Sequence, residues 1–576
     1  MRNFLVSILI GLFLWAGVSF AGISENDILI VVNNNSPLSI AAKDKYRTYH
    51  PGVPADQVVY LDGIPDANSP EKEIITRSNF EELIASPIRQ FLIDNDLVND
   101  ILVILTTAGL PYRIECTNYP NVIKPYASNG ADVVNHTDEI TAATVESELA
   151  ILWLIDPNLA DADDPNCQCP LVGALINPYH GYIDSFSMAG TRDMLNRRLN
   201  FRYNTSAPYM DDYRVWEGQT FSIYGIPLTG RALSARDIYL VCRFDVPHEW
   251  FWNPTIYMDR MLESAARVSD PESPNYHGYD PAWSLIVLDA KSGGSDATHR
   301  WYNIGGTYNV YTGPENLPTF ASYPAPPSPG SSGIYRYHFD NTYEYLEQAG
   351  YGPDYGPNVT DGNYAIEISP NTVGGVMLYD PENTLMNYGW DANYGCISYF
   401  GFGIHQAGTE PNYIHQGGPN NDKFQQPVYG SVFNTWESYN CTTFFPNAPF
   451  GQYERHGLLA DWLAIDGSAG IGHAFEPMGY AVAGNGLLMW NYLKDLDGDG
   501  VGDMCFIEAA YSAIPYLSWA TVVVGDPLMR IHVEEGVGPG IMEPHSCSNE
   551  NGAAMMATPL LLLCLPWLFR RSAARV

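Results

Sequence analysis

The chain has 576 residues, enough for a large core and, by length alone, for roughly three or four domains. Acidic residues outnumber basic residues 65 to 29, which gives a formal net charge of −36. This charge excludes binding to DNA, RNA or anionic lipid through general electrostatic attraction, because those partners require a basic surface. The abundance of Tyr, Pro and Gly is typical of a loop-rich exported protein.

Residues 1–21 have the pattern of a secretory signal peptide. Arg2 supplies the basic start, an apolar run begins at Phe4, and a small-residue site ends at Ala21. We expect cleavage after Ala21, and a retained transmembrane anchor is the alternative. Export permits disulfide bonds in the mature chain.

The first elements of the mature chain predict a βαβ unit. The apolar run Ile28–Val32 precedes Ser36-Pro37. This pair is a strong helix start, because Ser caps the helix and Pro fits its first turn. We expect the helix to end near Tyr49 and a second strand to follow at Gln57–Leu61.

The alternation of strands and helices continues to residue 290. We expect two further helices, three further strands and one insertion at 116–230, which itself holds a helix over 140–155. The helices cover 79–95 and 254–268, and the strands lie within 100–114, 235–247 and 283–289. Strands that are apolar on every residue favour a mostly parallel sheet with helices on both faces. Residues 22–290 are therefore expected to form an N-terminal α/β region.

A Gly-, Pro- and Tyr-rich loop or linker over 291–335 separates this region from a C-terminal α/β region at 336–535. Strands are expected within 373–380, 396–404 and 518–527, and helices at 456–466, Met478–Leu493 and Phe506–Ala513. One large sheet with long insertions is the simplest interpretation. Two separate α/β domains meeting near residue 300 are the alternative.

Residues 536–576 are expected to form a linker and a C-terminal sorting or membrane-anchor tail. Cys547 precedes an apolar run of about 17 residues, which is at the short limit for a membrane span. A terminal group of Arg residues follows, which would stay on the cytoplasmic side. The tail resembles the C-terminal sorting signals of some Gram-negative bacteria, in which a Cys marks the anchoring point. That resemblance implies a location at the cell surface or outer membrane, and a plain tail anchor is the alternative.

Several stretches, taken in order, resemble a family of exported bacterial proteins with no established activity. They include "ILIVVNNNSPLS", "ILVILTTAGLPYRI", "ESELAILW", "CRFDVP", "ADWLAIDGSAGIGHAFEP" and "AYSAIPYLSWATVVVGDPLMR". The closing block also resembles the end of the catalytic domain of gingipain-type cysteine peptidases. In those enzymes a caspase-like α/β fold carries a His and a Cys at the ends of neighbouring strands. The resemblance thus implies a caspase-like or flavodoxin-like core.

His405 and Cys441 are the candidate catalytic pair. Each follows a predicted strand, and adjacent parallel strands would bring the two side chains into one crevice at their carboxyl ends. A cysteine peptidase needs a thiolate with a base within hydrogen-bond reach. Seven cysteines remain outside the tail, so at least one is unpaired, and a disulfide between Cys441 and Cys396 is the alternative role.

Polar residues near other strand ends are candidates for lining the same crevice. They are Asn33, Thr106, Arg243, Asp245, Ser438, His473, Glu476 and Asp526. Arg243 and Asp245 could bind a substrate carboxylate or form a structural ion pair. His473 with Glu476 could serve acid–base chemistry or a metal, or could simply pack. Asp526, in Gly-Asp-Pro, could equally cap the turn that ends a strand.

The stretch "DLDGDGVGD" predicts a calcium-binding loop. Asp495, Asp497, Asp499, Val501 and Asp503 take positions 1, 3, 5, 7 and 9 of such a loop, with Gly500 at the sharp turn. Position 12 is Phe506 instead of the bidentate Glu of an EF-hand. The loop lies between two predicted helices, so the calcium ion is expected to be structural. A solvated acidic turn is the alternative.

Two hypotheses for function stay open, and the sequence does not decide whether the protein is an enzyme. The first is an exported, surface-anchored protein with a peptidase-like core that is active or degenerate. The second is a non-enzymatic surface protein that binds peptide or glycan. For the second, residues 248–254 and 298–313 supply Tyr- and Trp-rich platforms.

Overall fold

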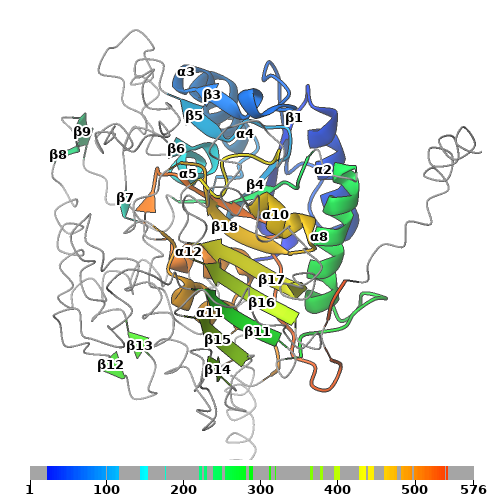
Figure 1. Cartoon of the computed structure of the whole chain (residues 1–576). Coiled ribbons are helices and arrows are strands. Elements are labelled where there is room, and N and C mark those ends of the chain that lie inside the picture. The colour runs from blue at the N-terminus through cyan, green and yellow to red at the C-terminus, as the bar shows by residue number, and fades with distance from the viewer. Residues whose placement is uncertain are drawn as a thin grey trace, which may run out of the picture. The chain divides into compact units, whose positions relative to one another are not determined.

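The computed structural model gives the fold of the chain and describes part of its residues (Figure 1). The described residues are 22–98, 100–115, 143–152, 175–176, 220–223, 226–229, 238–248, 253–280, 284–289, 311–312, 318–319, 364–366, 376–380, 395–401, 427–435, 439–445, 459–475, 482–493, 495, 499–514, 516–538 and 540–542. By its internal contacts the chain divides into residues 1–540 and residues 541–576. The main sheet and its helices lie in the first of these units.

One eleven-stranded sheet joins strands from both predicted regions. Its order across the sheet is β14 (Tyr364–Ile366), β15 (Val376–Asp380), β11 (Ser284–Asp289), β16 (Gly395–Gly401), β17 (Pro427–Thr435), β18 (Ala469–His473), β20 (Thr521–Val524), β10 (Leu240–Phe244), β4 (Val103–Thr107), β1 (Ile28–Asn33) and β2 (Val58–Leu61). Because β11 pairs with β15 and β16, the two regions share one sheet. The prediction of a single large sheet is therefore confirmed, and the alternative of two separate sheets is wrong.

The direction of the strands reverses in the middle of the sheet. Strands β2, β1, β4, β10 and β20, here called the first half, are mutually parallel. Strands β18, β17, β16, β11 and β15, the second half, are also mutually parallel. The halves meet at β18 and β20, which are antiparallel with His473 opposite Thr521. The expectation that all strand exits lie along one margin is wrong, since the carboxyl ends of the halves point to opposite margins.

Helices cover both faces of the first half, as predicted. Neighbouring residues of a strand point to opposite faces of a sheet. Thr107 contacts Ser39 of α2 (Pro37–Tyr49), whereas Thr106 contacts Glu146 of α5 (Val145–Ala150). Helix α8 (Pro254–Ser269) runs beside α2 (Figure 1), and a bond from Lys45 to Asp259 joins the two helices.

Helix α2 occupies the predicted residues because its cap functions as expected. The Ser36 hydroxyl accepts a hydrogen bond from the Ser39 amide at 3.3 Å, and Pro37 occupies the first turn. The predicted helix over 79–95 consists of α3 (Arg77–Phe80), a π-helical turn at Glu81–Ala85 and α4 (Ser86–Asp94). The π turn ends two residues before Pro87, whose ring nitrogen cannot donate to a regular α-helical bond.

Strands β14 and β18 of the main sheet are not predicted by the sequence. Strand β18 lies in "GSAGIGH", which has the composition of a loop. A Cβ atom on Gly470 would lie 2.5 Å from a side-chain carbon of Leu459, and one on Gly472 would lie 2.5 Å from the Cys441 Cβ. The two glycines thus let other segments pass close to the sheet, and packing selects the strand.

Three helices complete the second half of the chain: α10 (Leu459–Ala464), α11 (Asn485–Leu493) and α12 (Phe506–Ala513). Helix α12 has the predicted bounds, whereas α11 begins at Asn485 and not at Met478. The core is apolar, and Trp462 and Trp519 are among its largest fully buried side chains. None of the helices in the described part of the chain is long and apolar enough to cross a membrane.

Small sheets and short turns lie outside the main sheet. The sheets are β3 (Ile74–Thr76) with β5 (Arg113–Glu115) and β6 (Ala143–Thr144), β7 (Leu175–Ile176) with β19 (Tyr516–Leu517), β8 (Thr220–Ile223) with β9 (Ile226–Thr229), and β12 (Tyr311–Thr312) with β13 (Pro318–Thr319). Short 3₁₀ turns occur at Glu25–Asp27 and Pro70–Glu73.

Candidate functional site

The reversal of strand direction separates the candidate residues into two groups. At the carboxyl ends of first-half strands lie Asn33, Thr106, Arg243, Asp245 and Asp526. Beyond the carboxyl ends of β16, β17 and β18 come His405, Ser438, Cys441, His473 and Glu476. Strands β16 and β17 are adjacent and parallel, as the His405–Cys441 hypothesis requires. Of this second group only Cys441 and His473 are among the described residues.

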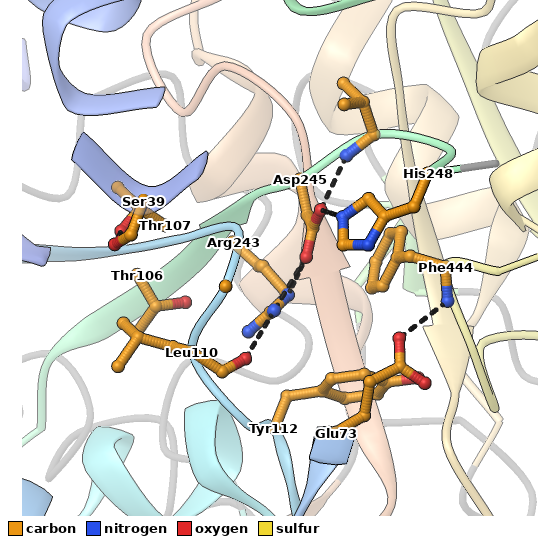
Figure 2. Close-up of polar contacts among 12 residues, drawn as sticks. Ser39, Glu73, Thr106, Thr107, Leu110, Tyr112, Arg243, Asp245, His248 and Phe444 are labelled. Atoms are coloured by element: carbon orange, nitrogen blue, oxygen red, sulfur yellow. Dashed lines mark hydrogen bonds and ion pairs between the residues drawn. The ribbon is translucent and has the colours of Figure 1, made fainter. Parts of the chain in front are cut away.

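A buried ion network surrounds Arg243 at the end of β10 (Figure 2). Its Nε and Nη2 donate to Asp245 Oδ2 at 2.8 and 2.6 Å. Its Nη1 donates to Glu146 Oε1 at 3.0 Å. Nη2 also donates to the carbonyl of Leu110 at 2.7 Å. The guanidinium plane lies over the ring of Tyr112, 4.7 Å from the centroid. Each nitrogen of Arg243 therefore has an acceptor within the protein.

Asp245 links this network to His248. Asp245 Oδ1 lies 2.8 Å from His248 Nε2 and accepts a bond from the amide of Val246. Burial alone would raise the pKa of Asp245, but the charges of Arg243 and His248 outweigh burial and lower it. Asp245 is thus held as a carboxylate, and the predicted ion pair between Arg243 and Asp245 is confirmed.

Glu146 supplies the second buried carboxyl of the network. Its Oε1 accepts bonds from Arg243 and, at 2.8 Å, from Thr106 Oγ1. Its Oε2 is buried with no hydrogen-bond partner. Burial raises the pKa of Glu146, and Arg243 offsets part of that effect. Because Arg243 is only 1% exposed and fully paired, the network is suited to joining α5 to the sheet and not to binding a substrate carboxylate.

Residues 439–445, here called the strap, carry Cys441 across the sheet. The amide of Cys441 donates to the carbonyl of His473 at 3.0 Å, and the Tyr112 hydroxyl donates to the carbonyl of Cys441 at 2.9 Å. The strap therefore connects the end of β18 with the segment that follows β4. The missing Cβ of Gly472 gives it room to lie against the strand.

The Cys441 thiol is buried and neutral. The residue is 1% exposed, and burial raises the pKa of the thiol well above its usual value in spite of the nearby Arg243 charge. Cys396 and Cys441 are both free, so the alternative of a disulfide between them is wrong. Cys242 and Cys505 are also free and buried. His473, at the end of β18, is fully buried too.

Asp526 belongs to a second polar cluster, at the end of β20. Its Oδ1 accepts from the amide of Leu528 at 3.0 Å and from the Tyr46 hydroxyl at 3.3 Å. Its Oδ2 lies 2.9 Å from Nε2 of His50, whose Nδ1 is 3.2 Å from Glu25 Oε1. Asp526 thus caps the turn as predicted, and it also forms an ion pair with His50 that the sequence did not suggest.

The crevice between β1 and β4 is filled by the protein's own polar groups. Asn33 Nδ2 donates to the carbonyls of Pro65 and Gly109, at 3.1 and 2.9 Å. The Ser39 hydroxyl accepts from the amide of Asn33 and lies 2.6 Å from the hydroxyl of Thr107. Gly109 has a φ of +82°, and a Cβ there would meet the Ser36 hydroxyl at 2.0 Å. These contacts close the crevice around the predicted candidate Asn33.

The described part of the acidic loop, Asp495 with residues 499–503, is held by its own carboxylates. Asp495 accepts from the amides of Asp499 and Gly500, and Asp499 accepts from the amide of Val501. Gly500 has a φ of +84°, as the sharp turn requires. Asp497 lies outside the described residues, and Glu508 caps α12 by accepting from the Cys505 amide. Among the described residues, no group of three or more His, Cys, Asp or Glu is placed to hold a metal ion.

The sequence reasoning missed several buried or half-buried titratable residues, among them Glu73, Glu146, His248 and His50. Glu146 had the clearest signal, since it falls in an otherwise apolar helix, "VESELA", where an acid needs a buried partner. His248 follows Asp245 by three residues, a spacing that allows contact. Glu73 and His50 had no local signal, because their partners lie hundreds of residues away in the chain.

The remaining predicted positions lie outside the described residues. They are His405, Ser438, Glu476, Asp497 and Cys547, together with residues 249–252 of the aromatic segment 248–254 and most of the segment 298–313. Comparisons with protein-family models, with curated proteins and with solved structures found no match to this chain.

Proposed function

We propose that this chain is an exported, surface-anchored protein with a degenerate peptidase-like core, which binds peptide or glycan and does not cleave it through Cys441. The observation that carries the proposal is the buried thiol of Cys441. A cysteine nucleophile needs a lowered pKa and an open approach for its substrate. Here burial raises the pKa of Cys441, and the strap holds the residue against β18.

The proposed core is caspase-like or flavodoxin-like. In the first half of the sheet, the strand order β2-β1-β4-β10-β20 follows the chain as 2-1-3-4-5. This is the order of flavodoxin-like doubly wound sheets, which bind ligands at the carboxyl ends of strands 1 and 3. The bonds from Asn33 and Ser39 fill that place in this chain, so they support a scaffold role for the first half.

The aromatic segments are then the proposed binding sites for peptide or glycan. Residues 248–254 and 298–313 hold Trp and Tyr side chains, which suit flat sugar rings and peptide side chains. The first segment starts at His248, whose ring is fixed by Asp245 and packs edge-on against Phe445 at 4.5 Å. These contacts fix the residue from which the first segment starts, and residues 249–252 themselves lie outside the described residues.

Labelling with an electrophilic thiol probe tests the absence of peptidase chemistry. The folded mature chain and Cys441→Ala are expected to label equally at pH 7, because the buried thiol is protonated. After denaturation the wild type is expected to carry one more labelled cysteine than Cys441→Ala. This difference shows that the probe can react with Cys441 once the thiol is exposed. Rapid labelling of folded wild type, lost in Cys441→Ala, would overturn the proposal.

Binding is tested with peptide and glycan arrays probed by the mature chain. A ligand that binds the wild type is expected to bind Trp250→Ala with Trp252→Ala at least about tenfold more weakly, as is usual when aromatic anchors are truncated. Thermal unfolding of the double variant controls for loss of fold. Equal binding by both proteins would place recognition elsewhere.

Surface anchoring and a structural calcium ion are the remaining parts of the proposal. Cys547→Ser is expected to release the protein from the cell surface into the medium, whereas a plain tail anchor would retain it. Asp495, Asp497, Asp499 and Asp503, with the carbonyl of Val501, would supply the oxygen ligands that Ca²⁺ prefers. The compact turn centred on Gly500 supports that assignment.

A further inference from the structure

Glu73 joins the strap to the segment before β3. Its Oε1 accepts a hydrogen bond from the amide of Phe444 at 2.9 Å (Figure 2). The carbonyl of the same Phe444 accepts from the amide of His248 at 2.8 Å. The centre of the strap is therefore held on one side by a carboxyl group and on the other by the main chain after β10.

The other oxygen of Glu73 has no hydrogen bond. Glu73 is 1% exposed, and its Oε2 is buried without a hydrogen-bond partner. Arg113 Nη2 lies 3.7 Å from Oε2 and forms a buried ion pair with it, at a separation too long for a hydrogen bond. Without a hydrogen bond this ion pair offsets only part of the cost of burying the carboxylate, whereas the neutral acid keeps Oε1 as an acceptor for Phe444.

Several charged or titratable groups face Glu73. Arg113, from β5, and His248, beyond β10, favour its ionised form, as do bonds from the strap at Thr443 and Phe444. Tyr112 and the Cys441 thiol lie close enough to Glu73 for its charge to raise their own pKa values. Burial outweighs the favourable groups and raises the pKa of Glu73 from 4.5 to about 7.

We propose that Glu73 is a pH-dependent latch on the strap: the protonated carboxyl holds the strap closed, and ionisation loosens it. The closed strap buries Glu73, and the open strap returns it to water. This latch goes beyond the proposed function, since it concerns access to the face of the sheet and not what binds there.

The direction of the effect follows from proton linkage. Glu73 binds its proton more tightly when buried, so the closed strap is favoured at low pH. Closure weakens as the pH rises above 4.5, the value for the exposed acid, and the loss is complete above about 7. If opening fully solvates Glu73, the opening equilibrium rises between pH 5 and pH 8 by on the order of tenfold to a hundredfold.

Hydrogen exchange of the strap amides, followed by mass spectrometry, tests the latch. Glu73→Gln imitates the neutral acid, and its amide oxygen can still accept from Phe444. Comparing the two proteins at equal pH cancels the intrinsic pH dependence of exchange. At pH 5 the strap amides of the wild type are expected to exchange at a rate within a few-fold of the rate in Glu73→Gln. At pH 8 they are expected to exchange at least about tenfold faster than in Glu73→Gln.

Glu81→Gln is the matched control, because Glu81 is also buried but pairs with Arg89. The strap amides of Glu81→Gln are expected to exchange at the same rate as those of the wild type at both pH values. A constant ratio between wild type and Glu73→Gln from pH 5 to pH 8 would overturn the latch. If Glu73→Gln fails to fold, strap exchange in the wild type is compared with exchange in β4, and parallel pH profiles refute the proposal. No step relies on thiol reactivity, so the outcome is separate from that of the Cys441 labelling.

Discussion

The ion pair between His50 and Asp526 makes the sharpest prediction about stability. Burial alone would lower the pKa of His50, but the charges of Asp526 and Glu25 outweigh it and raise the pKa from 6.5 to about 10. The difference between these values corresponds to roughly 5 kcal/mol at about 1.4 kcal/mol per pH unit. Removal of one partner of a buried ion pair costs roughly 3–5 kcal/mol. We therefore expect His50→Gln to lower the free energy of unfolding by about 3 kcal/mol at pH 6.

The pH dependence distinguishes this ion pair from ordinary packing. A raised histidine pKa stabilises the fold fully below 6.5, the unfolded value, and the contribution is lost as the pH rises through about 10. Urea unfolding of wild type and His50→Gln, followed by tryptophan fluorescence from pH 6 to pH 10.5, should show the difference shrinking toward zero. His532→Gln is the control, because burial lowers the pKa of His532. The effect of this substitution on the free energy of unfolding should therefore change with pH only below 6.5. A difference for His50→Gln that stays constant up to pH 10.5 would refute the reasoning.

Three further predictions concern the strap, the buried network and the acidic loop. Gly472→Ala should cost about 1–3 kcal/mol, because its Cβ would lie 2.5 Å from that of Cys441; urea unfolding measures the loss, and Cys441→Gly should restore part of it. Arg243→Met should cost about 3–5 kcal/mol by leaving Asp245 and Glu146 without their cation, and an unchanged melting temperature would contradict the buried ion pair. Calorimetry should detect saturable Ca²⁺ binding to the mature chain that Asp497→Ala with Asp499→Ala abolishes, whereas heat that persists in the double variant would place the ion elsewhere.

Local signals explain the elements that were predicted well. Ser36-Pro37 fixes the start of α2, and Phe506–Ala513 forms α12 at its predicted bounds. These signals act within a few residues, so they survive in any tertiary context. Strand β18 was missed because Gly470 and Gly472 favour a loop when taken alone, and only the close approach of Leu459 and Cys441 explains them.

The direction of a strand has no signature in its composition, and this limited the prediction of the site. An apolar run such as Thr521–Val524 fits a parallel or an antiparallel neighbour equally well. The sequence therefore placed all the strand ends along one margin, whereas the reversal at β18 and β20 separates the two sets. The strap then returns Cys441 to Tyr112 and the Arg243 network, a contact that no local pattern indicates. Partners such as His50 and Asp526, 476 positions apart, were beyond any local pattern.

The position of β20 has a consequence for how the protein matures. This strand comes last along the chain among those of the main sheet, yet it lies between β18 and β10, where it joins the two halves. Until β20 is inserted, each half presents an unpaired inner edge, and such edges invite pairing with other chains. A chain that stops before residue 521 is therefore expected to aggregate, because both inner edges would stay open.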